Sequence, residues 1–368
     1  MLSDGFSSMV MKGNIKLEHG AGGEGMHELL KLVLRYFDFN KVRGNEGVEI
    51  EVEVPLNALD DSAVVDHIVF TTDSHTVKPL FFPGGDIGNL AIAGTVNDIA
   101  VMGAEPLCLS AAFVIEEGFP VSDFERILTS MKRTCEEAEV SIVTGDTKVV
   151  ERGAVEKIVV NTSAIGKRTA ALDKNLEKVR MYRELEANWL VDSNLRDGDK
   201  IIVSGYLGDH GVALLSFREG FEFDTELRSD IAPLNKLIHE LLEVGGVVAM
   251  KDPTRGGLAN TLNEFSGKSN VGILIEEDAI PIRESVRSAC EMLGIDPLEI
   301  GNEGKVVMGV VNEKANEVLE ALRRTERGKD AAIIGTVTNE LTGVVMKTRV
   351  GGMRIVETPI GDPVPRIC

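Results

Sequence analysis

One segment in the first third of the chain restricts the fold more than any other. From Leu90 to Met102 nearly every residue is small or apolar, and the apolar positions have helical spacing. A helix with this surface packs closely on a sheet, because it has no wide polar face to turn to water. We therefore expect it in the core of a layered domain. Asn97 and Asp98 interrupt the apolar character, and a carboxylate there needs a cation or a hydrogen-bonding partner.

Around this helix, short apolar strands that end in polar or glycine-rich turns recur along the chain. The patterns predict strands at 48–54, 60–65, 68–75, 108–115, 157–165, 200–205, 247–251, 273–276 and 306–311, and a hairpin from 344–347 and 353–356. At 141–149 they predict a strand that runs into a polar turn. They predict further helices at 26–34, 122–138, 212–217, 234–243, 282–293 and 315–323. The charged stretch 173–197 is interpreted as a connector or surface insertion.

The length of the chain favours two domains. A chain of 368 residues is too long for one ordinary core. We expect an N-terminal segment with a glycine loop (1–47), a first α/β domain (48–168), a second α+β domain (169–340) and a C-terminal tail (341–368). The fold class is α+β, with two layered domains whose turns face a shared cleft.

Charge excludes two classes of partner. The chain has 59 acidic and 39 basic residues, a net charge of −20, which repels nucleic acid and anionic membrane surfaces. No run of 18 apolar residues predicts a membrane span, and Met1 to Lys12 does not have the form of a secretory leader. Four scattered cysteines, 108, 135, 290 and 368, predict neither a zinc site nor a disulfide framework and fit the reducing cytoplasm.

The C-terminal tail ends in a thiol. Pro359, Pro363 and Pro365 remove backbone donors and favour an extended conformation before Cys368. Nine extended residues span about 30 Å, so the arm could carry the thiol into a pocket and out again. The alternative is a frayed end with an incidental cysteine.

Polar turns supply candidate ligands. The sequence from His19 to Gly25 is a glycine loop that opens a helix, which presents free N–H groups to an anion, although such loops also serve as simple turns. Acids lie at strand ends at Asp60, Asp61 and Asp73, where metals are commonly held, and solvated turns are the alternative for each. The strand ending near Asp146 adds an acid and a lysine, Lys148, a pairing suited to a metal-bound phosphate.

Several of these turns together resemble the ATP-dependent synthetases related to aminoimidazole ribonucleotide synthetase. The resemblance rests on Asp60-Asp61, Thr72-Asp73, Gly84 to Gly88, Asn97 to Ala100, Gly145 to Lys148, Asp252 to Gly257 and Gly301 to Lys305. Within that group, His19 to Gly23, His75 to Gly85 and the terminal Pro365-Arg366-Ile367-Cys368 resemble the HypE family of hydrogenase maturation proteins. The match runs from about residue 15 to the end, and the stretch 173–197 departs from it.

This resemblance implies an activity, two cofactors and several partners. The terminal thiol would receive a carbamoyl group from HypF, and ATP with Mg²⁺ would drive dehydration of the thiocarbamate to a thiocyanate. A HypC–HypD complex would then accept the cyano group for the iron of nickel-iron hydrogenase. The resemblance also implies a homodimer joined through the first-domain sheets, and the strand at 48–54 offers an open edge.

The implied chemistry nominates residues for each role. Metal-bound phosphates need several carboxylates, for which we expect Asp60, Asp61, Asp73, Asp98 and Asp146, with Asp252 as a weaker candidate. The nucleotide is expected near Gly22, Gly23, Asp86, Asn97 and Lys148. Cys368 is the expected reacting thiol. Proton transfer is expected from Glu303, with His75 and His210 as further candidates. For each histidine, a structural role is the alternative.

Two other functions remain open from the sequence. The ATP site could phosphorylate a free small molecule, which would leave Cys368 without a role. Alternatively, the thiol could only bind a metal or a partner, although no other Cys or His lies near it in the sequence to complete a metal site.

Overall fold

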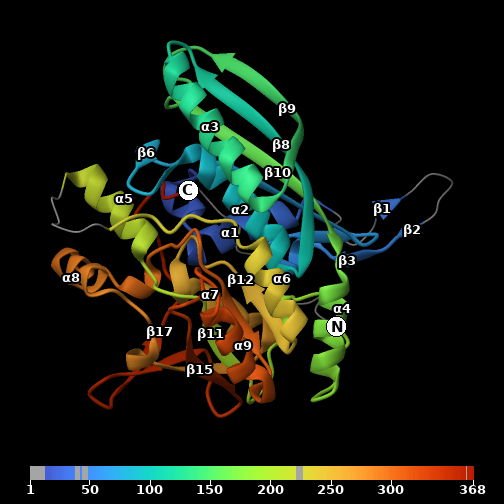
Figure 1. The fold of residues 1–368 in the computed structure, drawn as a ribbon. Coiled ribbons are helices and arrows are strands. Elements are labelled where there is room, and N and C mark those ends of the chain that lie inside the picture. Colours follow the sequence, from blue (N-terminus) through green and yellow to red (C-terminus); the bar gives the residue numbers. More distant parts are fainter. Residues whose placement is uncertain (1–12, 38–41, 44–48, 221–226, 362) are drawn as a thin grey trace.

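The computed structural model describes residues 13–37, 42–43, 49–220, 227–361 and 363–368. Two sheets with their helices form two layered units, one above the other in Figure 1. The α+β class expected from the sequence is confirmed. The first sheet lies in the N-terminal half of the chain, and the second sheet takes its strands from the C-terminal half.

The first sheet has six strands in the order β3-β4-β5-β10-β8-β9. Neighbouring strands are antiparallel except β8 and β9, which run parallel. Their bounds are β3 (Val52–Val54), β4 (Ala63–Val65), β5 (Ile68–His75), β8 (Ala104–Glu116), β9 (Ser141–Val150) and β10 (Ile158–Arg168). The β6 (Phe81–Phe82) and β7 (Gly85–Asp86) strands form a separate small hairpin.

Two helices cover one face of this sheet (Figure 1). The small and apolar segment forms α2 (Ile87–Val101), which packs on β5, β8 and β10 and is buried around almost its whole circumference. Outside it lies α3 (Val121–Ala138), whose amphipathic pattern leaves one polar face to solvent. The expectation of a core helix over this segment is confirmed.

The other face of the first sheet carries exposed apolar side chains. They include Ile68 and Phe70 of β5 and Ile165 of β10. Register places Phe70 beside Ile165 and Ile165 beside Cys108, so one row crosses three strands. An apolar surface that spans a sheet in this way is typical of an interface.

The second sheet has seven strands in the order β12-β14-β11-β15-β13-β16-β17. Their bounds are β11 (Lys200–Val203), β12 (Val247–Lys251), β13 (Gly272–Glu276), β14 (Val307–Val310), β15 (Ala332–Thr338), β16 (Val344–Lys347) and β17 (Met353–Val356). The helices of this half are α5 (Asp209–Glu219), α6 (Asn235–Val244), α7 (Gly257–Ser269), α8 (Glu284–Leu293) and α9 (Ala315–Arg323).

Three sequence expectations need correction in the C-terminal half and at the N-terminal edge. The central strand β15 was not expected at all. The hairpin of β16 and β17 is confirmed, but it joins the second sheet, so the tail proper begins only after Val356. The strand expected over 48–54 is divided into β2 (Glu49–Ile50), which pairs with β1 (Val42–Arg43), and β3; residues 44–48 lie outside the described part.

The charged stretch 173–197 is not a surface insertion. Most of its first third belongs to α4 (Ala170–Arg180), which packs on α6. Trp189 is buried, and its indole N–H donates to Glu53 over 2.8 Å. The following turn buries Asp192 and Asn194 between the two sheets' units. The connector therefore helps to fix the first domain against the second.

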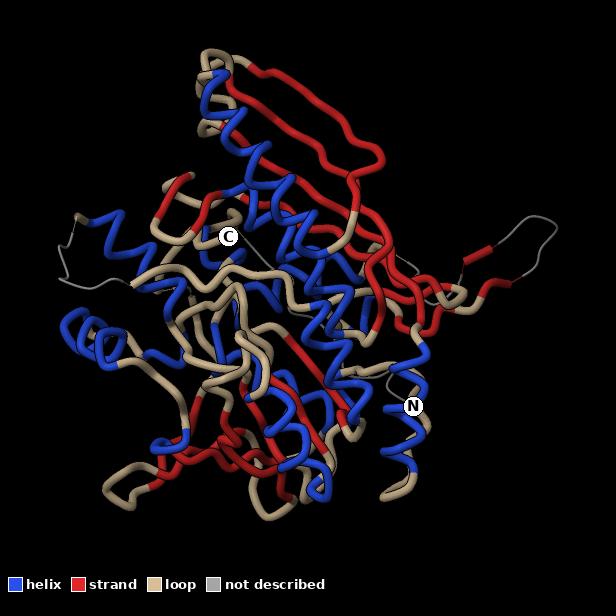
Figure 2. The backbone as a smooth tube through the Cα atoms, viewed as in Figure 1, coloured by secondary structure: helices blue, strands red, loops and turns tan. Residues whose placement is uncertain are grey.

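The chain's C-terminus lies among loops between the two sheets (Figure 2). Before the first sheet, the glycine loop leads from a short 3₁₀ turn (Leu17–Gly20) into α1 (Gly23–Leu34). Within the described residues, no helix combines the length and the apolar character needed to span a bilayer.

Candidate functional site

The last residues of the tail are docked in the protein. The N–H of Thr76 donates to the backbone oxygen of Cys368 over 3.2 Å, and the N–H of Lys78 donates to that of Arg366 over 3.1 Å. Val364 and Ile367 are fully buried. The tail thus runs along the segment that follows β5. In this structure it is bound to a defined surface of the protein.

Side chains of α5 (Asp209–Glu219) also hold the tail carbonyls. His210, on α5, donates from Nε2 to the oxygen of Ile367 over 3.0 Å, because a carbonyl can only accept. Its Nδ1 then accepts from the Ser229 hydroxyl over 2.7 Å. Burial lowers the pKa of His210, consistent with a neutral ring. Arg218 donates to Pro365 over 2.7 Å. Both ring nitrogens of His210 therefore make hydrogen bonds that help to hold the docked tail.

The glycine loop contacts the base of the same tail. The N–H of Glu24 donates to the oxygen of Pro359 over 3.2 Å. A Cβ on Gly23 would lie 1.9 Å from that oxygen, and a Cβ on Gly22 would lie 2.9 Å from the oxygen of Arg255. Both glycines also have positive φ, at 70° and 80°. One N–H group of the loop thus binds the tail, and the loop backbone packs closely against the tail and the Arg255 turn.

A cavity of about 320 Å³ lies beside the terminal residue. Its wall includes Ala21 from the glycine loop, Thr76 after β5, Arg255 and Cys368. The charge at Cys368 is the largest influence that raises the pKa of the Arg255 guanidinium, and Asp73 and Glu303 act in the same direction against burial. Arg255 is therefore the cation that faces the terminal residue.

Three carboxylates gather between the two domains. Oxygens of Asp61, Asp98 and Asp252 all lie within 4.8 Å of one another. Asp61 follows a short 3₁₀ turn, Asp98 lies near the end of α2, and Asp252 follows β12. The Thr71 hydroxyl donates to Asp98 over 2.8 Å and fixes its orientation. Three acids from distant parts of the chain thus meet at one point.

Burial and mutual repulsion make this cluster fit a divalent cation. Burial, with the charges of Asp252, Asp73 and Asp61, raises the pKa of Asp98 well above its usual range. Burial and the charge of Asp61 raise the pKa of Asp252 to about 8. Like charges this close are costly without a compensating cation, and carboxylate oxygens are ligands that Mg²⁺ prefers.

Two lysines of the second domain, the buried Lys251 and the half-buried Lys268, approach the cluster. Lys251 lies 2.7 Å from Asp61, 3.4 Å from Asp192 and 3.2 Å from Glu264. Burial raises the pKa of Asp61 to about 6, although Lys251 opposes this shift. The candidate Asp60 is held 3.5 Å from Lys268 and accepts from the N–H of Asp192. Asp60 thus joins an ion-pair network at the edge of the cluster.

The proton-transfer candidates lie between the cluster and the tail. His75 Nε2 is 3.6 Å from Asp73, and burial lowers the pKa of the ring. Glu303 is held by its N–H, which donates to Asp230, and one of its buried oxygens has no hydrogen-bond partner among the described residues. Burial and the charges of Asp252, Asp230 and Asp73 raise the pKa of Glu303 well above its usual range. Both are buried titratable groups with shifted pKa values, as is common for residues that transfer protons.

Four predicted residues lie away from the cluster. Asp86 caps α2 through the N–H groups of Gly88 and Asn89, and Asn97 uses its amide to hold Ala232 and Leu234. Asp146 and Lys148 are exposed on β9. Asp146 pairs with Ala112, and two strands, β8 and β10, lie between β9 and the strand β5 that carries Asp73. Three inter-strand steps of this kind span about 14 Å. One copy of the chain therefore does not gather all five predicted metal ligands.

Sequence reasoning also missed several residues of the site. Arg255 and Lys251 had no assigned role, and Asp252 was given less weight than Asp146. The signal was present in the turn from Asp252 to Gly257, which joins an acid, a proline, an arginine and two glycines in six residues. Their meeting with Cys368 and Asp61 depends on long-range packing.

Comparison with protein families identifies both halves of the chain. Residues 59–168 match the N-terminal domain of AIR synthase related proteins, and residues 196–347 match the C-terminal domain. A putative hydrogenase expression/formation protein of Methanocaldococcus jannaschii is 51% identical over 356 residues, or 95% of this chain and 98% of the relative. The carbamoyl dehydratase HypE of Rhizobium leguminosarum is 45% identical over 364 residues, or 98% and 96% of the two chains.

Solved structures give the same result. The crystal structure of a HypE–HypF complex contains a chain 48% identical, with a TM-score of 0.76, covering 83% of this chain and 95% of that one. A crystal structure of HypE in complex with ATP is 41% identical, with a TM-score of 0.75 and coverage of 96% and 99%. With sequence identity of this extent over nearly the whole length, the chain belongs to the HypE family of hydrogenase maturation proteins.

Proposed function

We propose that this chain is an ATP-dependent carbamoyl dehydratase that acts on its own C-terminal cysteine during hydrogenase maturation. The observation that carries the proposal is the docked Cys368, which lines the same cavity as Arg255. Arg255 in turn lies near the cluster of Asp61, Asp98 and Asp252. The names of the relatives, carbamoyl dehydratase HypE and hydrogenase expression/formation protein, support the same activity.

The proposed reaction removes one water from an S-carbamoyl group. The thiocarbamate on Cys368 and ATP give the thiocyanate, ADP and phosphate. The carboxamide oxygen forms a bond to the transferred phosphorus, the two N–H protons leave, and the C–O bond breaks with phosphate as the leaving group. The C–S bond to Cys368 remains intact throughout, so the product stays on the tail.

The residues present fit ATP and Mg²⁺. The crystal structure of a relative with ATP supports a nucleotide in this family. Asp61, Asp98 and Asp252 would hold Mg²⁺, and Asp73 lies close enough to influence the pKa of Asp98 and Asp252. When bound, these groups supply the phosphoryl donor and the positive charge that stabilises it.

The chain's own residues would orient the carboxamide and remove its protons. Arg255 faces the terminal residue and would orient the carbamoyl oxygen. Glu303, with its raised pKa and unpartnered oxygen, is the proposed general base, and neutral His75 is the second candidate. The dock formed by Thr76 and His210 would keep the reacting group out of bulk water.

The tail would occupy two positions in each cycle. In the docked position, Val364 and Ile367 are buried, so a large carbamoyl donor has limited access to the thiol. We propose HypF as that donor and a HypC–HypD complex as the cyanide acceptor; a solved HypE–HypF complex of a relative supports the first. We place the reaction in the cytoplasm, where free cysteines such as Cys135 and Cys290 stay reduced.

A homodimer would complete the site. The uncovered face of β5, β10 and β8, with its apolar row of Phe70, Ile165 and Cys108, is suited to a second copy of the same sheet. A two-fold arrangement could bring the exposed Asp146 and Lys148 of one copy toward the carboxylates of the other. This accounts for their separation from the cluster within one chain.

The test is mass spectrometry of the tail peptide. After incubation with HypF, carbamoyl phosphate and ATP, cleavage after Glu357 releases residues 358–368 with Cys368 intact. The expected product is a tail peptide that first gains a carbamoyl group and then loses one water only when ATP is present. Cys368→Ala is the matched control. Phosphate release that is undiminished in Cys368→Ala, with an unmodified wild-type tail, would contradict the proposal and favour a free small-molecule acceptor.

A further inference from the structure

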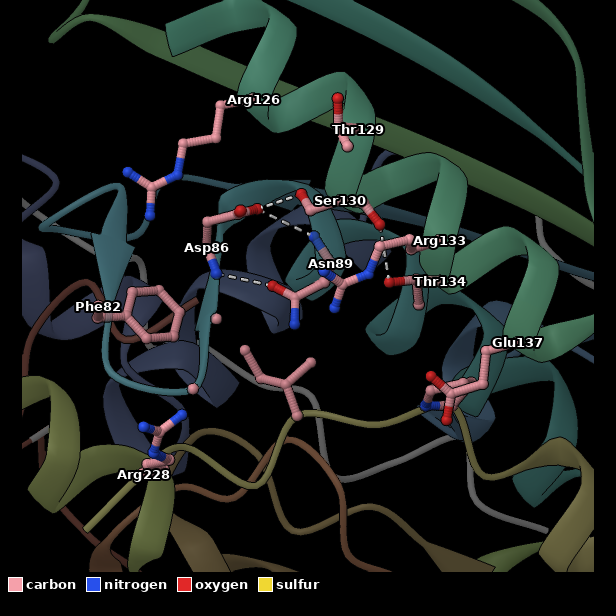
Figure 3. A pocket seen from close by; sticks show the side chains of 14 residues that line it. Phe82, Asp86, Asn89, Arg126, Thr129, Ser130, Arg133, Thr134, Glu137 and Arg228 are labelled. Atoms are coloured by element: carbon pink, nitrogen blue, oxygen red, sulfur yellow. Dashed lines mark hydrogen bonds between the residues drawn. The ribbon is translucent and has the colours of Figure 1, made fainter. Parts of the chain in front are cut away.

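A cavity of about 740 Å³ lies apart from the proposed active site. It is bounded by the start of α2, one side of α3 and the segment 228–233 (Figure 3). Asp86, at the start of α2, lines it, whereas Asp98 is twelve residues further along the same helix, or about 18 Å. Its volume is in the usual range for small-molecule sites.

Three arginines project toward this cavity. Arg126 and Arg133 extend from α3, and Arg228 comes from the opposite side (Figure 3). None of the three has an ion-pair partner among the described residues, although the chain has 59 acids. The guanidinium of Arg126 lies 3.9 Å from the centre of the Phe81 ring, which holds it in place.

The two acids that line the cavity offset the charge of the three arginines only in part. The Asp86 carboxylate accepts from the N–H groups of Gly88 and Asn89 and from the Ser130 hydroxyl. Glu137 pairs with Arg327, outside the cavity wall. The cavity therefore keeps an excess of positive charge on a strongly acidic protein.

We propose that this cavity binds a phosphate-bearing small molecule and thereby stabilises the docked tail. Guanidinium groups present paired N–H donors that match phosphate oxygens. The arginines converge on a concavity instead of spreading over a face, which favours a compact ligand. The net charge of −20 disfavours a long polyanion, which would extend beyond the three arginines.

A short series of contacts joins the cavity to the tail. Arg228 is followed by Ser229, whose hydroxyl donates to His210, and His210 donates to the oxygen of Ile367. Phe82 lines the cavity and contacts the His210 ring edge to face, with centroids 5.7 Å apart. A ligand that fixes Arg228 also restrains Ser229 and, through it, the His210 side chain that holds the tail. Such a ligand therefore binds the docked form of the protein more tightly than the form with a released tail.

Inorganic pyrophosphate is the probe for binding. Titration calorimetry in EDTA, which removes divalent cations from the carboxylate cluster, should show one site per chain. Arg133→Gln and Arg228→Gln should each weaken binding about tenfold or more, which corresponds to about 1.4 kcal/mol. Lys132→Gln removes the same charge from α3, but Lys132 is not part of the cavity wall, so its binding should equal that of the wild type.

Two results would overturn the binding site. One is the absence of measurable heat at millimolar pyrophosphate, which would leave an acidic protein segment as the occupant to consider. The other is an equal loss of affinity in Lys132→Gln and Arg133→Gln, which would indicate nonspecific attraction. Matching thermal melts of the variants, recorded without ligand, establish that all are folded.

Hydrogen exchange tests the connection to the tail. Pyrophosphate should slow exchange over residues 364–368 in the wild type and leave it unchanged in Ser229→Ala, which removes the hydroxyl contact to His210. Inorganic phosphate should act in the same direction at higher concentration, because it can engage fewer arginines at once. Pyrophosphate that binds in the wild type without slowing exchange of the tail would overturn the connection.

Discussion

The N–H of Thr76 donates a hydrogen bond to the backbone oxygen of Cys368 over 3.2 Å. Thr76 directly follows β5, and the same strand carries Asp73 and His75. One continuous segment therefore holds an acid near the carboxylate cluster, a buried histidine and the docking point of the terminal residue. Any shift of β5 would move all three together. The position of the thiol relative to Asp73 and His75 would therefore be kept.

The first prediction concerns the dock. His210→Leu removes the hydrogen bond to Ile367, worth about 1 kcal/mol, so the tail should be released several-fold more often. Hydrogen exchange over residues 364–368 should rise accordingly. His239→Leu, at an exposed position on α6, is the matched control and should leave the tail unchanged. If His210→Leu leaves tail exchange at the wild-type rate, this bond does not hold the tail.

The second prediction concerns the carboxylate cluster. Asp98→Asn keeps the volume of the side chain but loses the charge that a divalent cation requires. We expect a folded protein with at least about a hundredfold loss of ATP-dependent dehydration, or about 3 kcal/mol of transition-state stabilisation. Asp278→Asn, an exposed acid outside the cluster, is the control. Phosphate release by Asp98→Asn at the wild-type rate would remove Asp98 from the site.

The third prediction concerns pH. Burial and neighbouring acids raise the pKa of Asp98 and that of Asp252, the latter to about 8, so the folded state binds more protons than the unfolded chain. Stability without divalent cations should therefore fall as pH rises from about 4 to about 8. Melting temperatures in EDTA should show this fall, and millimolar Mg²⁺ should reduce it. A pH-independent melting temperature in EDTA would contradict the repulsion inferred for the cluster.

The fourth prediction concerns Arg255. Arg255→Gln removes the cation that faces the terminal residue, and a charged hydrogen bond of about 1.5–3 kcal/mol predicts a tenfold to hundredfold loss of turnover. Binding of ATP should change much less, and Arg255→Lys should recover part of the activity. Quantitation of the dehydrated tail peptide measures this loss. Equal turnover in Arg255→Gln and the wild type would exclude the proposed orienting role.

The sequence predicted most helices and strands correctly where the local hydrophobic pattern agrees with the packing in the folded protein. The apolar segment of α2 predicts a core helix because its composition leaves no polar face. The strand β15 was missed because Gly335 interrupts its β-branched residues, and glycine weakens a strand signal. A Cβ at this glycine would lie 2.4 Å from the oxygen of Leu274, so the close approach of β13 explains the residue. That reason is visible only in the folded sheet.

The sequence predicted the type of site, a carboxylate cluster, but only some of the residues that form it. Acids at strand ends predicted a carboxylate cluster, and Asp61 and Asp98 do meet. Asp252 was only a weaker candidate, because it lies over 150 positions from Asp98 and no local pattern shows that the two segments meet. It also could not distinguish His210 as a docking residue, because this depends on both its nitrogens meeting Ser229 and the tail.

The last prediction concerns sharing of the site between two copies. If Asp146 of one subunit serves the carboxylate cluster of the other, Asp98→Asn and Asp146→Asn chains should complement each other. In a mixed dimer with differently tagged chains, the Asp146→Asn chain keeps its own Asp98 and receives an intact Asp146 from its partner, so one of two sites is complete. Purified mixed dimers should then have about half of the wild-type activity, although each variant alone is inactive.

The same mixed dimer has no activity if Asp146 serves its own chain, because each of the two sites then lacks one acid. A dimer is the precondition, and it is tested by Phe70→Asp with Ile165→Asp, which places charges in the apolar row that crosses β5 and β10. Sedimentation should show monomers for this double variant and dimers for Met181→Asp, an exposed apolar position outside the sheet. Monomeric wild-type protein with full activity would exclude a shared site, and with it the role assigned to the exposed face of β9.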